Sequence, residues 1–591
     1  MSEKLKTILH ETDICVVGGG IGGMMTAISA ARHGAKVVLM QDRPVLGGNC
    51  SSEIRMWISG AGTRVRDLQE TGLMEELLLE NMHRNPRRNF TTWDALLYEK
   101  VKFEENIELL LNCSCCDAET VDGHIESIKG FQLTTYTWHQ VKAKIFVDSS
   151  GDSILAPLTG AEYKVGREAK AEFNEEFGLE QADPHTMGMS LMIQCRETDH
   201  PISYTPPAWA YDFPDDDAMN NKPHNLYAMN TNFYWVELGG MQDSIADTEE
   251  VRDELLKIAF GAWDHIKNHG DHGAENWDLE WVGFLPGKRE TRRYVGDYVV
   301  TEHDILAGGH FEDEVAYGGW PLDDHNPYGM RQTGESNVPS IMIPVEEPYG
   351  LPLRALYSRN VENLFFAGRN ISVTHAALSS TRVMGTCSVL GQAMGTAAGT
   401  AVKYHCSPRR VWEEHTKEVQ KILLDAGAFL PHIKRDIHPL MLEASMNVEE
   451  QVRLSLLNGW DRPRQEGEEK GLLQTPGDAL ELSWDAPREI PVLRLKFDPD
   501  YSRFSVSDNA KMRVFAQKLH TGFDFAPVRP AGTVAKGFVV YADGEEIFRT
   551  EKNEQSFVKI PLHVQAQKLR ILWTASYGKK VGLHSVDFLD E

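Results

Sequence analysis

The sequence has few cysteines for its length. Of the eight, only Cys113 and Cys116 have the Cys-x-x-Cys spacing, and none follows Cys406. A zinc ribbon needs two such pairs, so one pair disfavours it, and a secreted β-rich tail would more often carry a disulfide. The N-terminus, Met-Ser-Glu-Lys-Leu-Lys, leads into no apolar signal core. We therefore expect a cytoplasmic protein.

Positive charge and long apolar runs are also scarce. The formal net charge is -27, which argues against a broad electrostatic grip on nucleic acid. Residues 383–402 carry no charge, but Gly, Ala, Thr, Ser and Met dominate them. Such a stretch is too weakly apolar for a membrane span, so we expect no nucleic-acid partner and no membrane segment.

A chain of 591 residues is long enough for several domains. Residues 13–17 predict a buried strand, residues 24–32 a helix and residues 36–40 a second strand, which together make a β-α-β unit. Short strand-like runs separated by turns after residue 436 predict an antiparallel β-sandwich. The expected fold is α/β: a Rossmann-type nucleotide-binding domain, an inserted α+β substrate domain and a C-terminal β-sandwich. The Rossmann-type domain is expected to comprise residues 1–170 and 346–405, and the inserted substrate domain residues 171–345. A helical connector is expected at 406–435, and the β-sandwich at 436–591.

The glycine cluster after the first strand satisfies G-x-G-x-x-G with Gly18, Gly20 and Gly23. The first glycine allows a tight turn, the second lets the backbone approach a pyrophosphate, and the third permits close packing of helix on strand. The following helix N-terminus then faces the phosphates. The alternative is a chance glycine-rich turn, which the flanking strand, helix and second strand make less favourable.

The second strand should end in an acid that binds the adenosine ribose. Here Gln41 stands at that place and Asp42 follows. A glutamine can still bond a ribose hydroxyl, though less strongly than a carboxylate. The sequence leaves open which of Gln41 and Asp42 makes this contact.

Three ordered motifs then distinguish FAD from NAD. Arg43-Pro-Val-Leu-Gly47-Gly48-Asn49 resembles the segment that lies against the flavin diphosphate in the glutathione-reductase superfamily. Val147-Asp-Ser-Ser-Gly151-Asp152 is similar to the D-x-T/S-G-D stretch of those proteins. Leu364-Phe-Phe-Ala-Gly368-Arg369-Asn370 is similar to their A-G-D motif, with Arg-Asn in place of the acid that holds the ribityl chain.

The wider strings 41–55, 286–293, 367–375 and 380–385 resemble a family of FAD-dependent oxidoreductases often found beside bacterial carbohydrate-utilisation genes. The resemblance covers about residues 11–405 and implies one non-covalent FAD, since no flavin-attachment pattern is evident. It places Met384, Gly385 and Thr386 at the helix N-terminus that faces the flavin. The implied cofactor-binding residues are Gly18, Gly20, Gly23, Gln41, Asp42, Arg43, Gly47, Gly48, Asn49, Gly151, Asp152, Gly368, Arg369, Asn370, Met384, Gly385 and Thr386.

Two residues that follow the predicted strand 364–367, His375 and Arg382, are candidates for catalysis. By the family's topology, the loop that holds His375 faces the isoalloxazine ring, where a neutral imidazole could take a hydroxyl proton as hydride leaves for flavin N5. The alternative is a structural histidine that hydrogen-bonds a neighbouring carbonyl. Arg382, before the last helix, is expected to stabilise negative charge on the reduced flavin, against a role in packing alone.

A basic cluster, Lys288, Arg289, Arg292 and Arg293, stands out in an acidic chain. Arg289, Arg292 and the separate Arg55 are candidates for binding a substrate carboxylate or phosphate. Pairing with nearby acids such as Glu290 and Asp297 is the structural alternative. His303, His310 and His325 lie near aspartates, but their spacing matches no metal motif, so we expect no metal.

The sequence leaves three functions open. The first is hydride transfer between FAD and a carbohydrate or polyol. The second is a carboxylate-directed flavoenzyme of the fumarate-reductase or tricarballylate type, which the basic cluster and Gly60-Ala61-Gly62 favour. The third is a glycan-binding protein with a vestigial flavin domain, because the C-terminal segment resembles a discoidin or galactose-binding-like jelly roll. No recognised motif in the sequence indicates the substrate, the electron acceptor or the oligomeric state.

Overall fold

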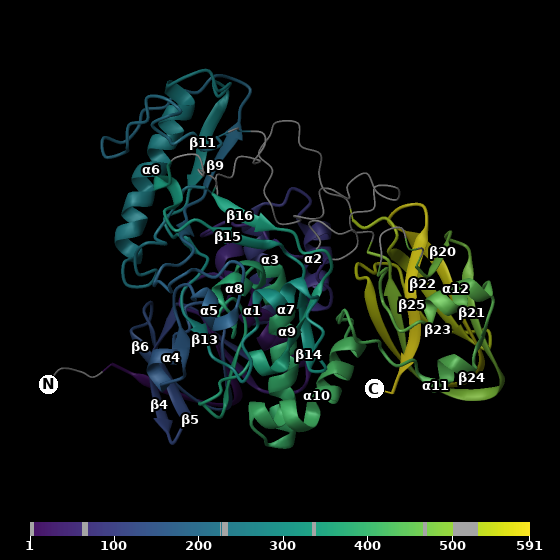
Figure 1. Cartoon of the computed structure of the whole chain (residues 1–591). Helices are drawn as coiled ribbons and strands as arrows, with labels where there is room; N and C mark the ends of the chain where they lie inside the picture. The colour runs from purple at the N-terminus through teal and green to yellow at the C-terminus, as the bar shows by residue number, and fades with distance from the viewer. Residues whose placement is uncertain are drawn as a thin grey trace. The chain divides into compact units, whose positions relative to one another are not determined.

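The computed structural model describes residues 5–590 except 62–68, 225, 227–234, 334–338, 465–467, 469 and 500–529. The described residues fall into two compact units. The first takes those of 1–59 and 87–416, and the second takes those of 60–86, 417–516 and 527–591. Figure 1 labels the helices and strands of both units.

A mixed sheet organises the first unit. Parallel strands lie in the order β3, β2, β1, β6 and β18, and β5 and β4 continue the sheet antiparallel beside the first half of β6. Their bounds are β1 (Thr7–Val17), β2 (Val37–Met40), β3 (Ile107–Leu110), β4 (Cys113–Val121), β5 (His124–Gln132), β6 (Thr137–Asp148) and β18 (Leu364–Phe366). The helices around this sheet are α1 (Ile21–Arg32), α3 (Phe90–Lys102), α4 (Leu155–Thr159) and α9 (Met384–Tyr404), and α8 (His375–Thr381) precedes α9 in the chain. This mixed α/β arrangement is consistent with the predicted Rossmann-type fold.

The parallel strands end in register at one edge. Val17 pairs with Met40 and with Asp148, and Phe366 also pairs with Asp148. Ligands of open α/β sheets bind outside the carboxyl ends of the strands. The loops that follow these residues therefore start from a common line and can converge on one ligand.

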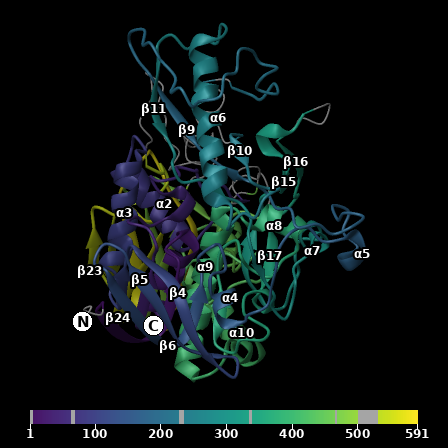
Figure 2. The ribbon, with the colours of Figure 1, turned by 90° about the vertical axis from the view of Figure 1, so that its left-hand side faces the viewer.

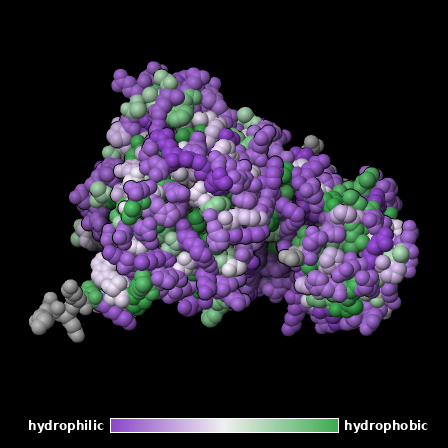
Figure 3. Space-filling view, turned by 90° about the horizontal axis from the view of Figure 1, so that it is seen from below, coloured by the Kyte–Doolittle hydropathy of each residue, from purple (hydrophilic) through white to green (hydrophobic). Residues whose placement is uncertain are grey.

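The uncharged stretch 383–402 forms most of α9, which packs tightly against α1. A Cβ on Gly391 would lie 2.2 Å from the Gly22 carbonyl oxygen, and one on Gly395 would lie 2.3 Å from that of Thr26. The Ser29 hydroxyl donates to the Gln392 carbonyl at 2.9 Å. The small residues thus serve helix packing. Among the described residues, no helix is long and apolar enough to cross a membrane, and the face drawn in Figure 3 is largely hydrophilic.

Residues 160–357 add short strands and one long helix. These elements are β7 (Tyr163–Lys164), α5 (Lys170–Phe173), β8 (Met189–Ser190), β9 (Ile193–Glu197), β10 (Glu237–Leu238), α6 (Thr248–Asn268), β11 (Trp277–Val282), β12 (Gly287–Lys288), β13 (Arg293–Tyr294), α7 (Glu302–Leu306), β14 (Glu314–Gly318), β15 (Leu322–His325), β16 (Ser340–Ile343) and β17 (Tyr349–Pro352). Helix α6 runs beside β9 and β11 (Figure 2). They share a core in which Leu255, Trp263, Ile193 and Trp277 are buried.

An antiparallel sheet dominates the second unit, in the order β20, β25, β21, β24, β22 and β23, with β19 beside β21. Its strands are β19 (Ser445–Met446), β20 (Leu472–Gln474), β21 (Ala479–Phe497), β22 (Ala535–Ala542), β23 (Glu545–Thr550), β24 (Phe557–Ser576) and β25 (Val581–Leu589), with helices α11 (Pro439–Glu443) and α12 (Glu450–Leu456). The connecting helix α10 spans Pro408–Asp425. The described strands form a single sheet and match the predicted β-sandwich only loosely. The discoidin-like resemblance stays a prediction.

The second unit also contains α2 (Leu73–Arg84), which comes from the N-terminal third of the chain. The Phe429 N–H donates to the Thr71 hydroxyl at 2.9 Å, and Arg462 donates to the Gln69 carbonyl at 3.0 Å. The sequence-based boundary at residue 170 does not anticipate this excursion. The local sequence of α2 predicts a helix but not the unit to which it belongs. Contacts with residues far along the chain place it in the second unit.

Candidate active site

The three motif glycines meet different surroundings. Gly18 has φ +101°, and a Cβ there would lie 2.4 Å from the Ser149 carbonyl oxygen. A Cβ on Gly23 would lie 1.8 Å from the Gly18 oxygen. At Gly20, the N-cap of α1, a Cβ would meet no atom nearer than the Gly48 Cα at 4.0 Å. Gly18 and Gly23 are thus required by the fold, whereas Gly20 leaves room for a ligand beside the helix N-terminus.

The end of β2 is turned toward the glycine loop. The buried Gln41 accepts from the Gly19 N–H at 2.6 Å and donates to the Val45 carbonyl at 3.1 Å. Asp42 is exposed, and Arg43 lies 3.6 Å from both Asp42 and Glu53. Gln41 therefore supports the loop, and the more accessible carboxylate at the strand end belongs to Asp42.

The Gly-Gly pair lies directly against the glycine loop. The Gly47 N–H donates to the Gly19 carbonyl at 2.8 Å, and a Cβ on Gly48 would lie 3.2 Å from the Gly20 Cα. Asn49 donates to the Lys288 carbonyl at 3.1 Å. Gly20 and Gly48, which belong to two separate motifs, therefore form one surface without side chains.

The other two motifs meet through an ion pair. Arg369 donates to Asp152 at 2.9 Å and Lys288 donates to the same carboxylate at 2.8 Å. Burial raises the pKa of Asp152, but Arg369 and Lys288 outweigh burial and hold it below its usual range. A Cβ on Gly151 would lie 2.9 Å from the Arg369 guanidinium. Arg369, which stands in place of the motif's acid, therefore holds the Asp152 carboxylate of the neighbouring loop beside it.

His375 lies between two carboxylates at the start of α8. Its Nδ1 is 2.9 Å from Glu290 and its Nε2 is 3.0 Å from Asp324, while its backbone N–H donates to Glu168 at 2.9 Å. Burial lowers the pKa of His375, but Glu290 and Asp324 outweigh burial and raise it to about 10. The ring is therefore an imidazolium at neutral pH, which is not the neutral form assumed from the sequence. The general-base role of His375 remains a prediction that its surroundings do not favour.

Arg382 belongs to a neighbouring buried network. It donates to the Asp323 carbonyl at 3.0 Å and lies 3.3 Å from that residue's carboxylate. Glu237 joins the network, 2.8 Å from His325 and 3.2 Å from Arg289. Burial lowers the pKa of Arg382, although Asp323 opposes this effect. The two networks meet on β15, where Asp323 and Asp324 are consecutive residues.

The basic cluster is largely paired within the protein. Arg293 forms ion pairs with Glu290 and Glu168. Arg292 donates to the Asp152 carbonyl at 3.2 Å and its guanidinium lies over Tyr163. These contacts favour the structural interpretation of the cluster over a surplus of charge for an anionic substrate.

Arg55 is held in an unusual conformation. Its φ is +63°, it donates to Gln194 at 2.7 Å, and its guanidinium lies 4.3 Å from the centre of the Trp281 ring.

Of the glycine stretch 60–62, a Cβ on Gly60 would lie 2.0 Å from Glu70, and the Ala61 N–H donates to the same carboxylate at 2.7 Å. Gly62 lies outside the described residues. The glycine at position 60 thus has a structural explanation.

Sequence reasoning missed the acids that surround His375 and Arg382. In the sequence, Glu290 stands out only as a partner of the basic cluster, and Asp323 and Asp324 only as aspartates close to His325. The consecutive acids before His325 were the available signal. Their partners lie more than fifty positions away, so no local pattern could assign them.

A family model described as FAD dependent oxidoreductase matches residues 13–423, more than half of the chain. The chain therefore belongs to this family, and it is an oxidoreductase that uses FAD. Curated relatives match only briefly: soluble pyridine nucleotide transhydrogenase from Marinobacter nauticus is 40% identical over 42 residues, 7% of this chain and 9% of that protein. Dihydrolipoyl dehydrogenase from Manduca sexta is 49% identical over 41 residues, 7% of this chain and 8% of that protein. The chain thus spans less than a tenth of each of these relatives.

Two solved structures are similar over most of the chain. A variant of the E. coli quinol fumarate reductase has 12% identity and a TM-score of 0.28, and the match covers 71% of this chain and 75% of that one. A geranylgeranyl bacteriochlorophyll reductase-like protein from Thermoplasma acidophilum has 14% identity and a TM-score of 0.31, covering 71% and 85%.

The residues at the strand edge fit FAD. The surface formed by Gly20 and Gly48 can accept a diphosphate without side-chain obstruction. Three buried oxygens of the same edge have no hydrogen-bond partner among the described residues: Ser149 Oγ, Asn370 Oδ1 and Thr386 Oγ1. Unsatisfied buried polar atoms are costly, and a polar cofactor would satisfy them. Met384, Gly385 and Thr386 start the 21-residue helix α9, whose N-terminal dipole favours a negative group.

Proposed function

We propose that this oxidoreductase transfers hydride between FAD and an uncharged, polyhydroxylated substrate of the carbohydrate or polyol class. When bound, FAD supplies the two-electron acceptor or donor for that transfer. The chain's own residues supply the polar surroundings of the substrate. Those residues are Glu237, Asp323, Asp324 and Arg382.

One observation carries the choice of substrate class. In the network around Arg382, Glu237 Oε1, Asp323 Oδ1 and Arg382 Nε are buried without a hydrogen-bond partner among the described residues. Carboxylate oxygens accept and a guanidinium donates. Substrate hydroxyl groups can satisfy both the acceptor oxygens and the donor nitrogen, because each hydroxyl donates and accepts.

The charge balance disfavours the carboxylate-directed alternative. Arg289 faces Glu237, Arg382 faces Asp323, and Arg369 and Lys288 share Asp152. An anionic substrate would have to compete with these buried carboxylates or lie beside them, and like charges in a buried site are costly. A neutral substrate avoids that cost.

Asp324 is the proposed acceptor for the substrate's hydroxyl proton. Its side chain is 22% exposed, whereas that of His375 is 6% exposed and has both ring nitrogens engaged. Burial raises the pKa of Asp324, but His375 and Arg167 outweigh burial and lower it. His375 then acts as a positioning residue that keeps Asp324 ionised and oriented.

The test is anaerobic reduction of the bound flavin, followed by its absorbance. A panel of sugars, polyols and dicarboxylates would be mixed with the purified holoenzyme. We expect reduction by members of the first two groups, and slower reduction in Glu237→Gln and Asp323→Asn than in the matched surface variant Asp199→Asn. A flavin that responds only to dicarboxylates would overturn the proposed substrate class.

A further inference from the structure

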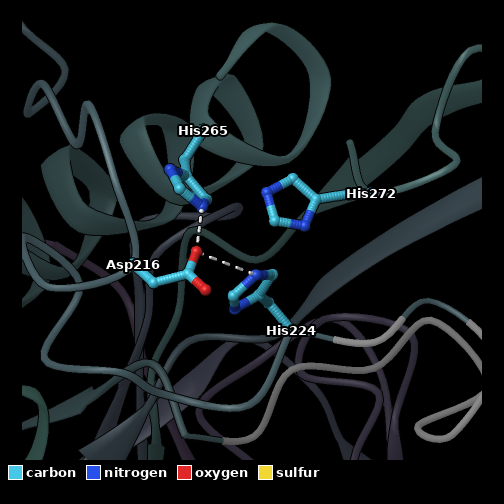
Figure 4. A group of neighbouring side chains, drawn as sticks. All are labelled: Asp216, His224, His265 and His272. Carbon is cyan, nitrogen blue, oxygen red and sulfur yellow. Dashed lines mark hydrogen bonds and ion pairs between the residues drawn. The ribbon is translucent and has the colours of Figure 1, made fainter. Parts of the chain in front are cut away.

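Four metal-binding side chains gather near the end of α6, apart from the residues of the candidate active site. They are Asp216, His224, His265 and His272, and one potential ligand atom from each lies within 4.8 Å of all the others. Figure 4 shows the carboxylate and the three rings turned toward a common centre. We propose that these four residues bind one divalent transition-metal ion, for which zinc is the best fit.

The fold brings the four residues together from two segments. His265 lies in the last turn of α6, whose core-facing neighbours Trp263 and Ile266 are buried. The chain then turns at Gly270 (φ +110°), before His272, which also lies near the helix end. Asp216 and His224 come from the preceding loop, where the N–H groups of Met219 and Asn221 donate to the Asp216 carbonyl.

Backbone carbonyls fix the orientation of all three rings. His265 Nδ1 is 2.8 Å from the Phe213 oxygen, His224 Nδ1 is 2.7 Å from that of Lys222, and His272 Nε2 is 3.1 Å from that of His269. A carbonyl only accepts, so each of these nitrogens carries the hydrogen. In a neutral ring the other nitrogen keeps its lone pair. Metal-binding histidines characteristically make this second hydrogen bond.

This orientation places a positive charge, from a metal ion or an added ring proton, at a favourable position. The opposite nitrogens of two rings face one carboxylate: His265 Nε2 is 3.0 Å from Asp216 Oδ1, and His224 Nε2 is 3.6 Å from the same atom. With neutral rings, lone pairs on nitrogen and oxygen point at each other. A metal ion between them converts this repulsion into coordination.

The donor set selects the kind of metal. Three imidazoles and one carboxylate oxygen suit zinc and its transition-metal neighbours rather than magnesium or calcium, which prefer all-oxygen sites. Four protein ligands also satisfy tetrahedral zinc, with metal–ligand distances of about 2.0–2.2 Å. The ligand atoms must therefore move closer together on binding. The Asp216 side chain is 56% exposed, which gives the ion an entry path and lets this ligand adjust.

A bound metal would join the loop of Asp216 and His224 to the helix that carries the core of this region. The role is structural, since four protein ligands leave no open position for a substrate. The proposal replaces our expectation of no metal, which considered only His303, His310 and His325. His265 and His272, with Asp216 and His224 far upstream, form no recognised spacing motif, so folding was needed to reveal them.

The experiment uses the FAD-loaded full chain without a polyhistidine tag. The protein is stripped with a chelator and titrated with Co²⁺ or Zn²⁺, and metal per chain is measured together with the visible absorption of tetrahedral Co²⁺. We expect one equivalent, and binding at least about a hundredfold weaker in His265→Ala, because even a lost outer-shell partner costs about 10–100-fold. His269→Ala is the matched control, since that ring lies on the same turn and bonds Asp264.

A second variant separates lost binding from lost folding. His265 is 1% exposed, whereas the His224 side chain is 13% exposed, so His224→Ala should fold even if His265→Ala does not. Flavin content, measured on the same samples, should stay at the parent level in the folded variants. Substoichiometric Co²⁺ and Zn²⁺ in the parent chain, or equal binding in His224→Ala, would overturn the proposal. Neither result depends on the substrate proposed above.

Discussion

Glu75 of α2 and Lys496 of β21 form a buried ion pair although 421 positions separate them in the chain. Ser556 completes the arrangement, because its hydroxyl donates to Glu75 and accepts from Lys496. This pair, together with the contacts of Thr71 and Gln69, makes residues from the N-terminal third of the chain a part of the C-terminal unit. The second unit therefore depends on a segment that lies upstream of most of the first.

Removing one member of this pair should destabilise the second unit. A lone charge left in a buried site costs about 3–5 kcal/mol, whereas replacing both partners by apolar groups costs far less. We expect Lys496→Met to lower the unfolding free energy by that amount and Glu75→Leu with Lys496→Met to recover most of the loss. Denaturant unfolding followed by tryptophan fluorescence would measure both. An exposed pair, Glu546 with Arg549, is the control, and equal effects at the two pairs would contradict the prediction.

Gly20→Val should abolish FAD binding without unfolding the protein. Gly20 has φ -65°, so its backbone tolerates a side chain, and the Cβ would meet no protein atom nearer than 4.0 Å. The added methyls would instead occupy the diphosphate path. Flavin absorbance per chain and circular dichroism give the two readouts.

Gly23→Val is the matched contrast, because its Cβ would clash with the Gly18 oxygen and should impair folding itself. Gly399→Ala, where the Cβ would make an ordinary 3.4 Å contact, should leave both readouts unchanged. Full FAD occupancy in a folded Gly20→Val variant would refute the assignment of the site.

His375 should act in its charged form. Its pKa is raised from 6.5 to about 10, so substrate-driven flavin reduction should be level across neutral pH and fall as pH rises through about 10. A neutral general base would give the opposite trend, a rate that rises toward that value. His375→Ala should retain FAD and slow flavin reduction about a hundredfold, the scale of an impaired general base, because Asp324 loses the partner that orients it. Stopped-flow traces over a pH series would decide between the two profiles.

The same shift has a consequence for stability. Because the folded pKa lies above the unfolded one, the stabilisation is fully present below about pH 6.5 and is lost as pH rises to about 10. His375→Asn should flatten this part of the stability profile in thermal unfolding. His303→Asn, at an exposed histidine, is the matched control for the substitution itself.

Arg382→Ala should lower the flavin midpoint potential. The parent guanidinium is a buried positive charge near the start of α9, and positive charge there favours the reduced, more negative cofactor. Its removal also leaves Asp323 without one partner. Arg382→Lys, which keeps the charge, should restore most of the potential. Spectroelectrochemical titration measures this directly, and an unchanged potential in Arg382→Ala would refute the role of this residue in stabilising the reduced flavin.

The sequence by itself determined the nucleotide edge of this protein. The predicted strands 13–17 and 36–40 coincide with the end of β1 and, to within one residue, with β2, because buried apolar runs and glycine positions are local signals. Strand β1 itself begins six residues earlier, at Thr7. The glycines carry backbone and steric requirements that hold wherever the chain folds this way. The choice of FAD over NAD came from the resemblance of three short motifs to those of known FAD enzymes.

Tertiary structure decided what the charged side chains do. His375 is an imidazolium because Glu290 and Asp324 lie on either side of it, and α2 belongs to the C-terminal unit because Glu75 meets Lys496. The cluster of Asp216 with three histidines likewise exists only after α6 ends beside its upstream loop. Electrostatic effects depend on distance and burial in three dimensions. Residue type and spacing along the chain fix neither quantity, so these properties follow only from the fold.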